Sequence, residues 1–308
     1  MRFDWWLPLA AVLWASTSPG WQAPQSPAGR ATFRSRIDRV TVSAVVRDHK
    51  GRIVPNLSPV DFEVIDAGRP REITDFRSDE APITVALLLD ASGSMRVASK
   101  MEEARQAADH VLAWLQPGKD EIGLFSFDRE LLELQGFAKA SSQRGGFDEV
   151  EPFGLTSLHD AIAEMARRVA ARRGSHRAVV VLTDGVDTSS RLTPAEVSGV
   201  ASAIDVPVYI VAVVSPLDDP RSPGAVLSKS TAGGSLVDLA QWTGGELFVT
   251  SMPSQTSIAA RKIVDELRHQ YLLAFEPGGN PGWHPLEVRA RDKRLTVRAR
   301  SGYFAGSS

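Results

Sequence analysis

The chain of 308 residues contains no cysteine, which excludes disulfides, zinc–thiolate sites, iron–sulfur clusters and thiol nucleophiles. Any bound metal would therefore be held by oxygen or imidazole ligands. A basic excess is also missing, since 35 Lys and Arg face 37 Asp and Glu for a net charge of -2, so we expect no nucleic-acid partner. The 6 histidines form no H-x-x-x-H or H-E-x-x-H pair, and neither a P-loop nor a G-x-S-x-G elbow is present.

The N-terminus has the pattern of a signal peptide. Arg2 precedes the apolar run Trp5–Trp14, and small or polar residues follow from Ala15. The run is too short to cross a bilayer as a helix, which takes about 20 apolar residues, and no later segment is long and apolar enough. We therefore expect residues 1–30 to be a signal peptide and linker, and the protein to be exported to the periplasm or the extracellular space. The alternative is a frayed apolar N-terminus of a cytosolic protein.

Two pieces of the chain, residues 31–80 and 271–308, show β patterns without helical periodicity. Apolar and polar residues alternate along Val40–Val46, which is typical of a strand with one buried face. The expected strands are Val40–Val46, Asp61–Ile65, Ile73–Phe76, Tyr271–Phe275, Leu286–Ala290 and Leu295–Ala299. Because an isolated piece of two or three strands is marginally stable, we predict that both pieces pair into one small antiparallel β-sandwich.

Between these pieces, residues 81–270 alternate strands with helices. The expected strands are Ile83–Leu89, Ile122–Phe127, Ala178–Thr183, Val206–Val214 and Leu247–Thr250. The expected helices cover Met101–Leu115, Leu158–Ala171, a segment capped by Thr193 and Glu196, a short segment beginning near Ser235, and Ile258–His269; Ser99 and Glu102 form a second possible capping box. This alternation predicts an α/β fold with a doubly wound, mostly parallel sheet, inserted into the sandwich.

Oxygen-bearing side chains follow three of the predicted strands or precede their helices. Asp90, Ser92 and Ser94 lie in a glycine-containing turn directly after the first strand. Thr156 precedes the second helix, and Asp184 ends the third strand. Ligands of doubly wound sheets bind outside the carboxyl ends of the strands, where all three loops should open. Hydroxyl and carboxylate oxygens suit a hard divalent cation such as Mg²⁺, with Mn²⁺ or Ca²⁺ as alternatives.

These motifs resemble the metal-ion-dependent adhesion site of von Willebrand factor type A domains, over roughly residues 82–270. The D-x-S-x-S turn, the threonine of the second loop and the aspartate of T-D-G occur here in that family's order. The flanking segments Val46–Gly51, Asp61-Phe62 and Arg300–Tyr303 are similar to the bacterial VWFA-related family described from Acidobacteria, whose members are typically exported. The resemblance implies direct metal contacts from Ser92, Ser94 and Thr156, and direct or water-mediated contacts from Asp90 and Asp184.

The same resemblance implies a protein-binding module in which an Asp or Glu of a partner protein or peptide completes the metal sphere, and no catalytic residues. Two other functions stay open: a metal-assisted hydrolase or phosphoryl-transfer enzyme, and a structural envelope component. The alternative for the site itself is that Ser92 and Ser94 cap a helix while Asp184 ends a strand. Two nearby residues, Asp187 and His159, are expected to be exposed to solvent in a loop and a first helical turn.

Overall fold

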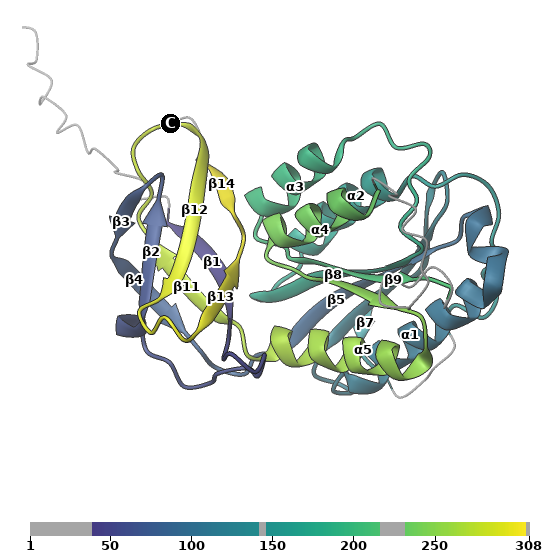
Figure 1. Cartoon of the computed structure of the whole chain (residues 1–308), viewed down its shortest axis with the longest axis horizontal. Coiled ribbons are helices and arrows are strands. Elements are labelled where there is room, and N and C mark those ends of the chain that lie inside the picture. The colour runs from purple at the N-terminus through teal and green to yellow at the C-terminus, as the bar shows by residue number, and fades with distance from the viewer. Residues whose placement is uncertain (1–38, 142–145, 216–231, 306–308) are drawn as a thin grey trace, which may run out of the picture. The chain divides into compact units, whose positions relative to one another are not determined.

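The α/β part of the chain contains a six-stranded sheet. The computed structural model in Figure 1 describes residues 39–141, 146–215 and 232–305. The sheet strands are β5 (Ile83–Asp90), β6 (Glu121–Phe127), β7 (Leu131–Lys139), β8 (His176–Thr183), β9 (Val208–Val213) and β10 (Leu247–Thr250). Their order is β10-β9-β8-β5-β6-β7, and every pair is parallel except β6–β7. All eight residues of β5 are buried, as expected for a central strand covered on both faces.

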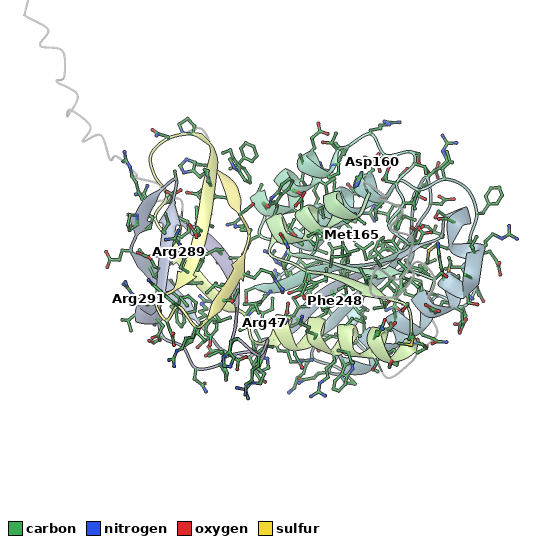
Figure 2. All side chains as sticks on the ribbon, in the orientation of Figure 1. Arg47, Asp160, Met165, Phe248, Arg289 and Arg291 are labelled. Atoms are coloured by element: carbon green, nitrogen blue, oxygen red, sulfur yellow. The ribbon has the colours of Figure 1, made fainter. Side chains whose placement is uncertain are left out.

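In the described part of the chain, five α-helices cover the two faces of this sheet. They are α1 (Lys100–Trp114), α2 (Leu158–Ala170), α3 (Pro194–Ala203), α4 (Ala232–Thr243) and α5 (Pro253–Arg268). Figure 1 shows α1 and α5 on one face and α2, α3 and α4 on the other, and each set packs on its own apolar core. Met165 of α2, labelled in Figure 2, is fully buried in the second core. The doubly wound α/β fold predicted from the alternating pattern is confirmed.

The remaining strands form two antiparallel four-stranded sheets. They are β1 (Val40–Arg47), β2 (Phe62–Asp66), β3 (Arg69–Arg71), β4 (Ile73–Arg77), β11 (Tyr271–Phe275), β12 (Gly282–Ala290), β13 (Thr296–Ala299) and β14 (Gly302–Ala305). The orders are β13-β1-β11-β4 and β14-β12-β2-β3, so each sheet contains strands from both pieces of the chain, and in the first sheet they alternate. Their buried side chains share one apolar core. Along β12 burial alternates, which leaves Arg289 exposed on the outer face (Figure 2).

Charged side chains join the sandwich strands to the α/β part. Arg298 of β13 donates hydrogen bonds to Glu246 and Glu266, and Arg47 of β1 forms an ion pair with the fully buried Glu266 of α5. Figure 2 shows Arg47 beside α5. Arg300 donates to the backbone carbonyls of Ser202 and Thr41. Because ionic groups cost several kcal/mol to bury unless they are paired, this arrangement favours a defined contact between the two parts.

Several local predictions differ from the structure. The capping box at Thr193 and Glu196 forms, but the one at Ser99 and Glu102 is wrong, because Ser99 has a left-handed backbone (φ 61°) and its side chain makes no cap bond. The strands β3, β7 and β14 were not predicted. The burial of β7 follows no strict alternation, since it is the half-exposed edge of the sheet. The last helix begins at Pro253, with proline at its first position, five residues earlier than its apolar pattern indicated.

Candidate metal centre

Asp90 lies at the centre of the candidate site because it is the last residue of the central strand β5. Its carboxylate is fully buried. The Ser92 amide donates to Asp90 Oδ1 at 2.9 Å, and the Thr183 hydroxyl of the neighbouring strand β8 donates to Oδ2 at 2.6 Å. The first bond closes a turn directly after the strand, and the second holds the carboxylate against β8. The side chain is therefore fixed at the carboxyl edge of the sheet.

Ser92 directly precedes the 3₁₀ segment η2 (Gly93–Ser99), and Ser94 lies in its first turn, with the two hydroxyl oxygens 3.0 Å apart. Ser92 is buried and Ser94 half-buried. The Gly93 amide donates to the carbonyl of Gly154 in the second loop at 3.0 Å. A Cβ at Gly93 would lie 3.2 Å from that carbonyl oxygen, so the close approach of the two loops favours glycine.

Thr156 is held between the first and third loops by backbone hydrogen bonds. Its amide donates to the Thr188 hydroxyl at 2.9 Å, and its carbonyl accepts from the amide of Thr188 at 3.0 Å and that of Ser189 at 2.9 Å. The Phe153 amide, in the same loop, donates to the carbonyl of Ala91 at 2.7 Å. The structure thus connects the three predicted loops at one edge of the sheet.

Asp184 directly follows β8, and its side chain is 1% exposed. The Lys100 ammonium donates to Asp184 Oδ2 at 3.0 Å, while the Val186 amide lies 3.4 Å from Oδ1. Sequence reasoning missed Lys100. Its position gave a signal, because it is the first residue of the helix that follows the D-x-S-x-S turn, and such a helix starts at the carboxyl edge of the sheet.

The electrostatics of Asp90 show a carboxylate without a charged hydrogen-bond donor. Burial, and to a smaller extent the nearby Asp184 carboxylate, raises the pKa of Asp90 to about 6, although the hydrogen bonds from Thr183 and Ser92 oppose that rise. Those two donors are an amide and a hydroxyl. A cation beside Asp90 would stabilise its ionised form. The chemistry of the five side chains fits a hard cation, since all of their donor atoms are oxygen.

No cluster of three His, Cys, Asp or Glu side chains suited to a metal occurs in the part of the chain that the structure describes. A site made of two carboxylates and three hydroxyls has a different composition from such a cluster. Such a site is therefore recognised in a sequence by the spacing of serine and threonine after predicted strands. The number of acidic or histidine residues is a weaker indicator of it.

The expectation that Asp187 and His159 are exposed is wrong. The Asp187 side chain is 16% exposed and accepts hydrogen bonds from the Ser190 hydroxyl at 2.6 Å and the His159 amide at 3.1 Å. The His159 ring is 11% exposed, with Nδ1 3.3 Å from Asp187. The first amides of α2 have no partner within their own helix, and Asp187 and Ser190 satisfy them. These residues position the Thr156 loop.

The middle of the chain matches a known protein family in sequence. Residues 85–186 match the family model of the von Willebrand factor type A domain. Among solved structures, the chain is similar to a von Willebrand factor type A protein from Catenulispora acidiphila (TM-score 0.49, 12% identity, 90% of this chain and 76% of that one). It is also similar to the conserved hypothetical protein BatB from Bacteroides thetaiotaomicron (TM-score 0.48, 17% identity, 60% of this chain and 98% of that one).

A third similar structure is the proximal thread matrix protein 1 from the mussel byssus, with a zinc-occupied MIDAS motif (TM-score 0.47, 16% identity, 66% of this chain and 49% of that one). No curated protein matches the chain. The stretch matched by the family model contains all five predicted ligands, Asp90, Ser92, Ser94, Thr156 and Asp184. The chain therefore contains a von Willebrand factor type A domain.

Proposed function

We propose that the protein is a metal-dependent protein-binding module. Asp90, Ser92, Ser94, Thr156 and Asp184 would hold a divalent cation, with Mg²⁺ as the first choice, and a carboxylate of a partner protein would complete the metal sphere. The observation that carries the proposal is the convergence of three hydrogen-bonded loops, each with its predicted ligands, at the carboxyl edge of one sheet.

The charges of the site favour an anionic ligand. Only two of the five side chains are acidic, and Lys100 already pairs with one of them. A bound divalent cation would supply a positive centre that these residues do not fully neutralise, and a hydroxyl-rich sphere keeps the cation electrophilic. An Asp or Glu of a partner is the common protein group that would complete such a sphere.

The proposed setting is outside the cytoplasm. It depends on the signal-peptide pattern of residues 1–30, which lie outside the described residues. Among the described residues, no helix is long and apolar enough to cross a membrane. An exported adhesion or assembly component is the role that we propose for the chain.

Two measurements on the full chain test this proposal. Calorimetric titration with MgCl₂ should show one site in the wild type and none in Asp184→Ala. The control Asp292→Ala, which changes a half-exposed aspartate of the sandwich, should behave as the wild type. The immobilised chain should then capture a protein from an extracellular or periplasmic extract in Mg²⁺ and release it in EDTA. Capture that persists in EDTA and in Asp184→Ala would refute the metal-dependent mechanism. Turnover of a phosphate ester that requires metal and Ser92 would instead support a hydrolase.

A further inference from the structure

Large apolar side chains are exposed on the same three loops that carry the candidate metal ligands. We call Val97, Phe153, Leu155 and Val186 the apolar rim. Phe153 is 75% exposed and Val97 60%, and the other two are also exposed. Val97 follows Ser94 in η2, Phe153 and Leu155 precede Thr156, and Val186 follows Asp184. Each metal-bearing loop therefore presents at least one apolar side chain to solvent.

The three loops that carry the rim are hydrogen-bonded to one another. The loop of Val97 is bonded to the loop of Phe153 and Leu155 through the Gly93 amide and the Gly154 carbonyl, which are 3.0 Å apart. The loop of Val186 is connected to it by the bonds between Thr188 and Thr156. Exposed apolar groups that gather around a polar centre mark a surface on which a partner can bury them.

A cleft of about 670 Å³ with an acidic lining lies near the rim. Its lining includes Ala91, the neighbour of Asp90. Its lining carries five acidic side chains and, among the described residues, no Lys or Arg; the acids are Asp128, Glu130, Asp148, Glu149 and Glu151. The Asp128 carboxylate would lie 3.4 Å from a Cβ placed on Gly154, between the rim residues Phe153 and Leu155. The cleft and the rim are thus adjacent.

We propose that the partner carboxylate comes from a segment in which one Asp or Glu has an apolar neighbour and a Lys or Arg. The inference rests on the proposed function. In this arrangement the carboxylate reaches the metal, the apolar neighbour covers the rim, and the basic residue enters the acidic cleft. A tract of several acidic residues is repelled by the cleft, and a carboxylate flanked by glycine leaves the rim exposed. Charge complementarity thus selects the partner segment.

The test uses three fluorescein-labelled peptides of equal length and fluorescence anisotropy with the full chain. The first carries one Glu between Phe and Arg, the second carries one Glu between Gly and Ser, and the third is a tract of Glu. In Mg²⁺ we expect the first peptide to bind at least about tenfold more tightly than the second, with the third binding weakest. Asp184→Ala should abolish the binding of all three.

Two variants separate the contributions of rim and cleft. Phe153→Ser should remove most of the preference for the first peptide, whereas Ile258→Ser, an equally exposed apolar residue of α5, should leave it unchanged. The double variant Glu149→Gln, Glu151→Gln should bind the first peptide more weakly, and its affinity for that peptide should depend less on the salt concentration. Neither change touches a predicted metal ligand, so calorimetric Mg²⁺ binding should be retained in both variants.

The outcomes distinguish this inference from the proposed function. Three results would overturn the inference alone. They are equal binding of the three peptides in Mg²⁺, tighter binding of the Glu tract, and no peptide binding while Mg²⁺ still binds. Peptide binding that is unchanged in EDTA and in Asp184→Ala would overturn the proposed function, because the metal would then have no part in recognition. If Phe153→Ser still prefers the first peptide, the rim does not contribute to recognition, and that part of the inference is wrong.

Discussion

Two buried aspartates, one in each part of the chain, are stabilised in opposite ways. Asp66 of the sandwich accepts hydrogen bonds from His284, Tyr303, the Gly278 amide and Arg71, at 2.8–3.0 Å. Its pKa is lowered, since the bonds to His284, Gly278 and Tyr303 outweigh the opposing effect of burial. Asp90 of the α/β part has two uncharged donors, and burial raises its pKa to about 6.

The difference between the donors of Asp66 and those of Asp90 is consistent with a structural role for Asp66 and with the metal-binding role proposed for Asp90. Both ring nitrogens of His284 face acceptors, Nδ1 toward Asp66 at 2.8 Å and Nε2 toward the Asn280 carbonyl at 2.6 Å, and this geometry favours the doubly protonated, positively charged ring. With Arg71, this gives Asp66 two cations from its own chain. Asp90 has no such cation among its hydrogen-bond donors, which is the arrangement expected of a group that receives its cation from solution.

The largest effect on stability is expected when the hydrogen bonds of Asp66 to His284, Tyr303 and Arg71 are removed. Asp66→Ala leaves the charges of His284 and Arg71 without their acceptor and should lower the free energy of unfolding by about 3–5 kcal/mol. In metal-free buffer, Asp90→Asn should cost far less or even stabilise, since it removes a buried charge that lacks a cationic partner. Urea denaturation in EDTA compares the two. An equal loss of stability in both variants would contradict the distinction between them.

Adding Mg²⁺ should raise the free energy of unfolding through the site at Asp90 and not through the cluster at Asp66. At a Mg²⁺ concentration 100 times the dissociation constant, the wild type should gain about 2.7 kcal/mol of stability, because the ion binds the folded chain alone. Asp90→Asn should gain almost nothing, while a destabilised sandwich variant such as His284→Gln should gain as much as the wild type. Urea titrations with and without Mg²⁺ measure these gains. A gain that is the same in Asp90→Asn would place the ion elsewhere.

Lys100 gives a smaller effect on the affinity for metal. Its ammonium pairs with Asp184 at 3.0 Å and adds a positive charge beside the site. Replacing it in Lys100→Met should tighten Mg²⁺ binding by about tenfold, since a repulsive charge and a competing donor are removed. Lys100→Arg keeps the charge and serves as the control in calorimetric titration. Weaker binding in Lys100→Met would show that the lysine instead orients Asp184 for the metal.

The smallest effect is a pH dependence within the sandwich. The Asn280 carbonyl and the Asp66 carboxylate raise the pKa of His284, so its stabilising contribution is complete below the usual histidine pKa of about 6.5 and declines as pH rises through the raised value. The stability difference between the wild type and His284→Gln should therefore be largest on the acidic side of that range and shrink above it. Urea titrations from pH 5 to 9 test this, and a difference that grows with pH would refute the charged ring.

Sequence reasoning succeeded where a local pattern reflects a global constraint. The continuous apolar run of β5 predicted a strand covered on both faces, and the D-x-S-x-S turn after it placed three oxygen side chains at the sheet edge. The same reasoning could not find the partners of Asp66, because His284 and Tyr303 lie 218 and 237 residues away in the chain. Lys100 was missed, and Asp187 was expected to be exposed, for a related reason, since their contacts depend on which loops meet in space.

The interleaving of strands in the sandwich also has a consequence for the order of folding. β1 pairs with β11 and β13, more than 220 residues later in the chain. During synthesis, β2 can pair with the short β3, but β1 and β4 have no partner strand until residues 271–299 have been made. Unpaired strand edges are prone to aggregate. The six-stranded sheet of the α/β part is made from one uninterrupted stretch of the chain, so this part can form earlier and bring the two β pieces together. The sandwich can close only after the strands of residues 271–305 have been made.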